Sequence, residues 1–297
     1  MSPRKHQLPT VRAALLVLAL GLLPACASNR GVPGWMQGWN DPRPAFPVIG
    51  SIHFVGTNRM GIFLITTPAG HILLDTGFEA KVPQLQKSVA SLGLRFEDIK
   101  IILASHAHID HVQGHALVRR LTGAKVVSSR ADAPTIATGG QQEWMYGDAY
   151  SWTPCPVDEI VEDGQKVELG GTTMTAHLTP GHSRGAITWT TTVKNPDGGK
   201  DLDVVFFASG SVGPGVRVVG NPAYPEAERA YQQSFATWRG LPCDVFLAAH
   251  SDLFELDAKY KRLVAGAHPN PFIDHAGYIA TIDKYETKFK ATVASQR

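Results

Sequence analysis

The feature that most constrains this chain is a group of four histidine and aspartate side chains within six residues, His106-Ala107-His108-Ile109-Asp110-His111. An apolar run at 101–104 precedes the group, and a helix-like stretch at 112–121 follows it. A short run of branched apolar residues is typical of a buried strand. The group is therefore expected on a strand-to-helix turn, at the end of a strand where α/β sheets place their sites.

Imidazole and carboxylate groups are good zinc ligands, and a catalytic zinc keeps three protein ligands and one open position. His106 and His108 are two residues apart on an extended turn, so both can face one metal. Asp110 and His111 are offset toward the helix, so they can face a second metal. Each ion then needs at least one further ligand. The spacing therefore predicts a site for two metal ions.

Two later histidines follow predicted strands. Pro180 and Gly181 force a tight turn after the strand at 172–178 and place His182 at its tip. His250 directly follows the buried strand at 245–249, and a histidine in that position suits the second metal, beside Asp110 and His111. His177 is expected to be core or to orient a ligand.

The group at 106–111 resembles the HxHxDH signature of the metallo-β-lactamase superfamily, and the Pro-Gly-His turn is similar to another of its motifs. The resemblance implies His182 as the third ligand beside His106 and His108. It implies an α/β fold (α+β in some schemes), namely a single-domain, four-layer αβ/βα sandwich with a two-metal site along one edge. It also implies that the turn Asp75-Thr76-Gly77 lies beneath the metals.

The end of the strand at 204–207 separates members of this superfamily. Glyoxalase II-like enzymes and lactonases have an Asp there, and subclass B1 and B2 β-lactamases have a Cys. This chain has Ala208 and Ser209 instead, which resembles subclass B3. Other segments agree with that subclass, namely Asn221-Pro222-Ala223-Tyr224-Pro225, Ser234-Phe235-Ala236-Thr237 and Leu241-Pro242-Cys243-Asp244.

The subclass resemblance implies two Zn²⁺ ions per chain. One would be held by His106, His108 and His182, and the other by Asp110, His111 and His250. The implied activity is hydrolysis of the β-lactam amide bond of penicillins, cephalosporins and carbapenems by a metal-bound hydroxide that Asp110 orients, which gives antibiotic resistance.

Ser209 and Ser211 are the hydroxyls nearest to the position where relatives bind the substrate carboxylate. The loop here is one residue shorter, with Val212 and Gly213 before Pro214.

Two alternatives to a β-lactamase are a lactonase or thioesterase of the same superfamily, and a metal-binding protein without activity. The missing Asp argues against the former, and the full ligand set with an open water position argues against the latter.

Composition limits the class of partner. The chain has 297 residues, of which 43% are hydrophobic and 18% charged, so it is globular with a sizeable core. A net charge of +2 without a basic run gives no reason to expect nucleic acid as a partner. We expect a small-molecule substrate, no protein partner and a monomer. The domain prediction is a signal peptide at 1–27, an N-terminal arm at 28–50 and one catalytic domain at 51–297.

The first 27 residues have the pattern of an export signal. Basic residues precede an apolar stretch at 13–23, which is too short to span a bilayer. Ala25-Cys26-Ala27 fits a cleavage site that releases a soluble protein, whereas the preceding residues also resemble a lipobox that would lipidate Cys26. Both alternatives predict the periplasm. Cys155 and Cys243 remain after the leader, and the sequence leaves open whether they form a disulfide.

Short apolar runs predict strands, and amphipathic stretches predict helices. A long aromatic loop at 139–157 either floors a substrate cleft or packs on its own base. Predicted strands are 52–55, 61–67, 71–75, 101–104, 125–128, 166–169, 172–178, 187–193, 204–207 and 245–249. Predicted helices are 82–92, 112–121, 130–138, 224–239, 255–265 and 272–294.

Overall fold

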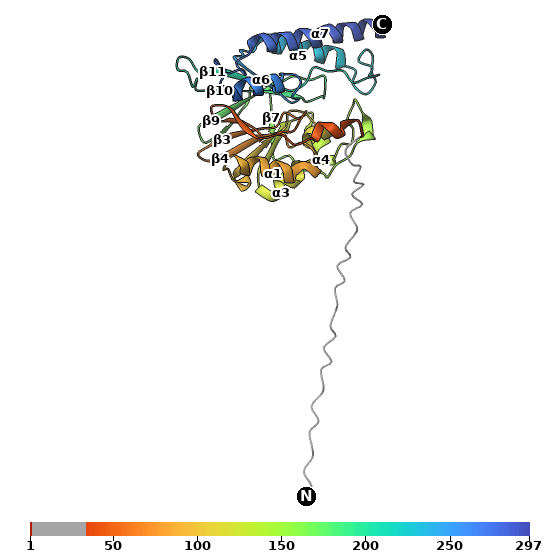
Figure 1. Ribbon diagram of the computed structural model, residues 1–297. Coiled ribbons are helices and arrows are strands. Elements are labelled where there is room, and N and C mark those ends of the chain that lie inside the picture. The colour runs from red at the N-terminus through yellow and green to blue at the C-terminus, as the bar shows by residue number, and fades with distance from the viewer. Residues whose placement is uncertain (2–33) are drawn as a thin grey trace.

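The structure is a computed structural model that describes Met1 and residues 34–297. Two β-sheets pack face to face, with helices on the outer face of each sheet (Figure 1). The first sheet has the order β1-β2-β3-β4-β5-β6-β7. Its strands are β1 Phe46–Ile49, β2 Ile52–Phe54, β3 Phe63–Thr67, β4 Gly70–Leu74, β5 Ile99–Leu103, β6 Lys125–Ser129 and β7 Glu159–Val161. Strands β1 to β4 pair antiparallel, and β4 to β7 pair in parallel.

The second sheet has the order β12-β11-β10-β9-β8. Its strands are β8 Lys166–Leu169, β9 Thr172–Leu178, β10 Ile187–Val193, β11 Leu202–Phe207 and β12 Val245–Ala248. Only β11 and β12 pair in parallel within this sheet.

The helices form the two outer layers. Helices α1 and α3 cover the first sheet, whereas α5 and α7 cover the second (Figure 1). The α-helices are α1 Val82–Ser91, α2 Ile109–Val112, α3 His115–Thr122, α4 Ala133–Thr138, α5 Ala227–Gly240, α6 Leu256–Val264 and α7 His275–Gln296, and the short 3₁₀ helices are η1 Gly34–Asn40, η2 Glu79–Lys81, η3 Phe96–Asp98 and η4 Gly147–Ala149. No helix in the described part of the chain combines the length and apolar character that a membrane span requires.

From Ile101 to Leu103, strand β5 is buried on both faces. Ile101 and Leu103 belong to the core between the two sheets, whereas Ile102 belongs to the core beneath the helices of the first sheet. A central parallel strand covered on both sides reads as a continuous apolar run, as this one does. The turn that carries His106 and His108 therefore begins at the end of a rigid, well-packed strand.

The predicted four-layer sandwich is confirmed. The helix predicted over 112–121 is confirmed over most of its length as α3, but Val112 belongs to the separate short helix α2. The carbonyl of His111 accepts hydrogen bonds from Thr76 N at 3.0 Å and Gly77 N at 3.2 Å, so it is already used where a continuous helix would need it. Strands β1 and β7 were not predicted, since both are short edge strands in proline-bearing stretches.

Two predictions concern cysteines and the leader. Cys155 and Cys243 are both free and buried, and they belong to different hydrophobic cores. The two therefore do not form a disulfide with each other. The predicted leader, including Cys26, lies outside the described residues except for Met1.

Candidate metal centre

The three-histidine group forms where β5 and β9 end. His106 and His108 follow β5, and His182 lies on the turn between β9 and β10. The ring centroids are 4.8 Å apart for His106 and His108, and 4.5 Å apart for His108 and His182. One donor atom from each lies within 4.8 Å of the others, and all three residues are buried. The structure thus brings together the first predicted ligand set.

The turn that presents His182 requires glycine. Gly181 has φ of +133°, and a Cβ there would lie 2.8 Å from the ring of Tyr231. A larger residue would be strained by its backbone conformation and by this contact. The close approach of Tyr231 to the turn therefore accounts for the glycine before His182.

Asp110, His111 and His250 form a second group beside the first. His111 Nε2 lies 3.3 Å from His250 Nε2 and 3.2 Å from Asp110 Oδ2, and His250 Nε2 lies 3.7 Å from that oxygen. Zinc bonds of about 2.0–2.1 Å in a tetrahedron separate ligand atoms by about 3.3 Å. The three donor atoms are therefore already spaced as one metal ion requires.

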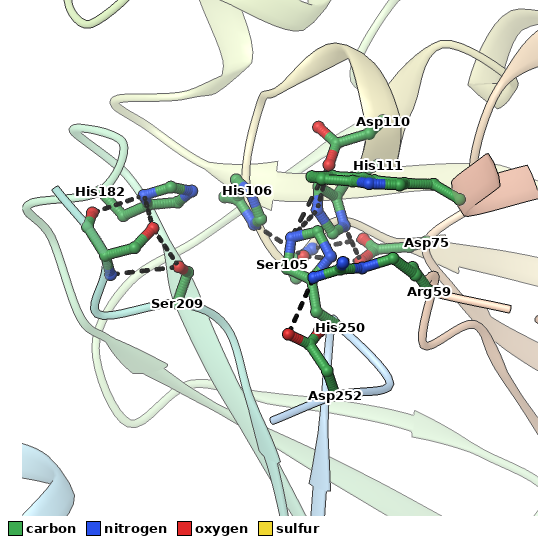
Figure 2. Close-up of polar contacts among 12 residues, drawn as sticks. Arg59, Asp75, Ser105, His106, Asp110, His111, His182, Ser209, His250 and Asp252 are labelled. Carbon is green, nitrogen blue, oxygen red and sulfur yellow. Dashed lines mark hydrogen bonds and ion pairs between the residues drawn. The ribbon is translucent and has the colours of Figure 1, made fainter. Parts of the chain in front are cut away.

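The two groups are adjacent. The ring centroid of His106 lies 3.9 Å from that of His111 and 4.7 Å from that of His182. In Figure 2, His106 stands between His182 on one side and His111 with His250 on the other. His106 Nε2 is buried and has no hydrogen-bond partner among the described residues. A buried imidazole nitrogen without a partner fits a metal ligand, because leaving it unsatisfied costs free energy.

Hydrogen bonds fix the outward nitrogens of the ligand rings. Asp75 Oδ2 accepts from His111 Nδ1 at 2.9 Å and from Ser105 Oγ at 2.6 Å. Since the Ser105 hydroxyl donates to Asp75, it accepts from His106 Nδ1 at 3.0 Å. The Ser211 carbonyl accepts from His182 Nδ1 at 2.9 Å. Each of these bonds sets the orientation of one ligand ring, so that its Nε2 atom points toward the metal site.

His250 reaches the site because the main chain of the first sheet approaches β12. Gly61 N donates to Ala249 O at 2.8 Å, and a Cβ at Gly61 would lie 2.0 Å from Ala248 O. Only glycine permits this approach. The ring of Trp39, in η1, packs edge-on against His250 with centroids 5.5 Å apart. The N-terminal arm thus reaches the metal centre.

Asp132 connects the two turns that carry the three-histidine group. Its Oδ2 accepts from Ala107 N at 2.9 Å and from Ser183 Oγ at 2.6 Å, and its Oδ1 accepts from Gly185 N at 2.8 Å. Asp132 is 3% exposed. One buried carboxylate therefore sets the distance between the β5 turn and the turn of His182.

The two groups differ in protonation before metal binds. Burial and neighbouring histidines lower the pKa of both His106 and His182 well below the ordinary value. Burial would also lower the pKa of His111, but Asp110 and Asp75 raise it to about 10. Burial would raise the pKa of Asp110, but the adjacent histidines hold it well below its usual range. The second group thus contains an ion pair, whereas His106 and His182 are neutral.

Other predicted residues have different surroundings. Ser209 is 2% exposed, and its Oγ lies 3.2 Å from the Ser211 hydroxyl, which lies 3.2 Å from His182 Nδ1. Their contact with substrate stays a prediction.

His177 is half-buried on β9. Its Nε2 lies 2.9 Å from Thr190 Oγ1, so His177 orients no ligand histidine through this nitrogen. The sequence analysis did not predict a role for Asp132, which follows β6 by three residues and belongs to no motif of the family resemblance.

Comparison with known proteins agrees with this geometry. The family model described as metallo-beta-lactamase superfamily matches residues 62–191. The native FEZ-1 metallo-beta-lactamase of Legionella gormanii is 38% identical, with a TM-score of 0.84 over 86% of this chain and 98% of that chain. BJP-1, a subclass B3 metallo-beta-lactamase of Bradyrhizobium japonicum, is 35% identical, with a TM-score of 0.81 over 88% of this chain and 97% of that chain.

Curated sequences match more weakly. The match spans about half, 48%, of the length of the first mycobacterial relatives, which are uncharacterised and 29% identical over 110 residues. A hydroxyacylglutathione hydrolase of Cereibacter sphaeroides is 26% identical over 72% of this chain and 71% of that protein. Taken with the structures, these matches show that the chain belongs to the metallo-β-lactamase superfamily of hydrolases. FEZ-1 and BJP-1 are subclass B3 enzymes, so the predicted resemblance to this subclass is confirmed.

Proposed function

We propose that this protein is a zinc-dependent β-lactamase that hydrolyses the amide bond of penicillins, cephalosporins and carbapenems and so gives antibiotic resistance. The observation that carries the proposal is the pair of adjacent three-ligand groups with Ala208 and Ser209, rather than Asp or Cys, directly after β11. This combination matches the subclass B3 pattern. The similarity to FEZ-1 and BJP-1 supports the same substrate class.

The donor set fits two zinc ions. His106, His108 and His182 would hold one, and Asp110, His111 and His250 would hold the other. Each group supplies three protein ligands and so leaves a position open. Zinc, when bound, lowers the pKa of a coordinated water to about 7 and polarises a carbonyl oxygen.

Residues of the chain would orient the attacking water and accept its proton. Asp110 Oδ2 faces the Nε2 atoms of His111 and His250, which leaves Oδ1 to accept a hydrogen bond from the attacking water. This bond would aim the water at the lactam carbonyl, and Oδ1 would take the proton of the water and pass it to the amide nitrogen as the C–N bond breaks. Asp75 keeps His111 from rotating during these steps.

A thioesterase of the glyoxalase II type is the second candidate. The similarity to a hydroxyacylglutathione hydrolase over 72% of the chain favours it. Such enzymes have an Asp after the strand that corresponds to β11, and Ala208 and Ser209 offer no carboxylate there. The β-lactamase proposal therefore agrees better with the site.

Absorbance decay of a carbapenem with purified protein tests the proposal directly. We expect turnover that EDTA abolishes and added zinc restores, with two zinc ions per chain by elemental analysis. A penicillin, a cephalosporin, a lactone and S-lactoylglutathione are assayed in parallel. A zinc-loaded protein that hydrolyses the thioester or the lactone but no β-lactam would overturn the proposal in favour of the second candidate.

A further inference from the structure

Four of the five histidines in the two metal groups have an acceptor for one ring nitrogen. Ser105, Asp75 and the Ser211 carbonyl anchor His106, His111 and His182, respectively. The Arg59 carbonyl does the same for His250. All four acceptors lie within a few residues of a strand. The acceptor that faces His108 is the exception, because it lies on the long loop at 139–157.

That acceptor is Glu143. Its Oε1 lies 3.4 Å from His108 Nε2, a buried nitrogen that forms no hydrogen bond with the residues described. Glu143 is only 8% exposed, although it belongs to a loop. Burying a carboxylate is costly unless it is paired. The position of Glu143 therefore needs an explanation beyond loop packing.

The same carboxylate holds the turn that follows it. Met145 N donates to its oxygens at 3.0 and 2.9 Å, and Tyr146 N donates to Oε2 at 2.6 Å. The Tyr146 ring then packs against His108 with centroids 5.2 Å apart. Glu143 thus contacts a ligand histidine and the backbone of the loop at once, so a change in the orientation of His108 changes the support of the turn.

We propose that Glu143 is a positioning residue that couples metal binding at His108 to the conformation of the turn at 143–147. With Nε2 facing Glu143, Nδ1 of His108 is the nitrogen that would hold a metal ion, and the ring would then keep Nε2–H directed at Glu143. The carboxylate then holds the amides of Met145 and Tyr146 and places the Tyr146 ring beside the metal centre. This inference rests on the metal site of the proposed function, and it adds that filling that site stabilises the turn at 143–147.

Glu143→Gln is the test variant because it keeps the size and one acceptor oxygen. It removes the charge and points an NH₂ group at N–H donors. Glu79→Gln is the matched control, since Glu79 Oε2 also holds this loop, accepting from Thr153 Oγ1 at 2.9 Å, rather than a ligand histidine. Circular dichroism of both metal-free variants verifies that they fold.

Two measurements are made on the wild type and both variants. Zinc affinity is determined by competition with a chromophoric chelator, and amide exchange of the peptide spanning 143–147 is followed with and without zinc. We expect zinc to slow exchange at Met145 and Tyr146 in the wild type and in Glu79→Gln. In Glu143→Gln we expect little such protection and zinc binding weaker by about tenfold to hundredfold.

The outcomes separate the two proposals. A wild type that binds no zinc would overturn the proposed function itself. A wild type that binds zinc without slower exchange at 143–147 would overturn the coupling alone, and this comparison needs no variant to fold. Equal zinc affinity in Glu143→Gln and Glu79→Gln would also overturn it.

Discussion

The carboxylate of Asp75 accepts a hydrogen bond from His111 Nδ1 at 2.9 Å, and both residues are at most 1% exposed. Asp75 has φ of 62°, in the left-handed region that Asp and Asn tolerate better than most residues. Through Ser105 the same carboxylate also supports His106. One residue after β4 therefore orients a ligand in each metal group without binding either metal.

Asp75→Asn tests this support. Asn keeps the shape and tolerates the left-handed backbone, so the change removes mainly the negative charge. We expect zinc affinity to fall by about tenfold to hundredfold, as for other partners of metal ligands. Isothermal titration calorimetry measures the affinity, with the exposed Asp201→Asn as a control that should bind as the wild type does. Unchanged affinity in Asp75→Asn would show that the hydrogen bond does not orient the ring.

Asp110→Ala should abolish most turnover while the fold remains. The change removes a ligand of the second group and the acceptor that orients water, and general-base groups of this kind contribute about 10²- to 10⁴-fold to rates. Carbapenem hydrolysis gives kcat, elemental analysis gives the zinc content, and circular dichroism verifies folding. A variant with near-normal kcat would remove Asp110 from the proposed mechanism.

The two metal groups should respond differently to pH. The pKa of His111 is raised to about 10, so between pH 6 and 9 a metal at the second group must displace a proton. Its apparent affinity should therefore rise about tenfold per pH unit. The lowered pKa values of His106 and His182 mean that these rings bind without losing a proton. Zinc titrations at several pH values, with proton release measured in two buffers, check this. Equal proton release at both sites would contradict it.

Asp132→Asn should loosen the connection between the two turns of the three-histidine group. The amide NH₂ of Asn would face N–H and O–H groups whose hydrogen bonds the buried carboxylate now accepts. A buried polar group left without a hydrogen bond lowers the free energy of unfolding by about 1–3 kcal/mol. Urea unfolding of metal-free protein measures this loss. Ser183→Ala removes one of the three donors and leaves the carboxylate, so its loss should be smaller. Equal stability of Asp132→Asn and the wild type would show that the connection is dispensable.

Both ligand groups could be predicted from the sequence because local pattern determines each position. His106 to His111 directly follow the apolar run of β5, His250 follows β12, and the Pro-Gly turn presents His182. In each case a buried strand fixes where the side chain emerges. Most individual strands and helices could also be predicted, since they carry clear hydrophobic patterns, whereas the four-layer arrangement was predicted from the resemblance to the family.

The residues that support the ligands were harder to predict. Glu143 lies in a loop with no periodic pattern, and it becomes significant only because the fold places it 3.4 Å from His108. Asp132 connects a turn 25 residues before it with a turn 51 residues after it, as its contacts with Ala107 and Ser183 show. The break between α2 and α3 depends on amides of the turn after β4. Tertiary contacts of this kind leave no signal in local spacing.

His111 and His250 are 139 residues apart in the chain, yet their nitrogens lie 3.3 Å from each other. An ion bound by both would close that long segment into a ring, much as a disulfide does, and long closed segments restrict the unfolded chain most. Ligand binding also stabilises the native state by mass action. The survival of the molecule against proteolysis would then depend on zinc supply, so zinc starvation of the host would reduce the amount of enzyme as well as its activity.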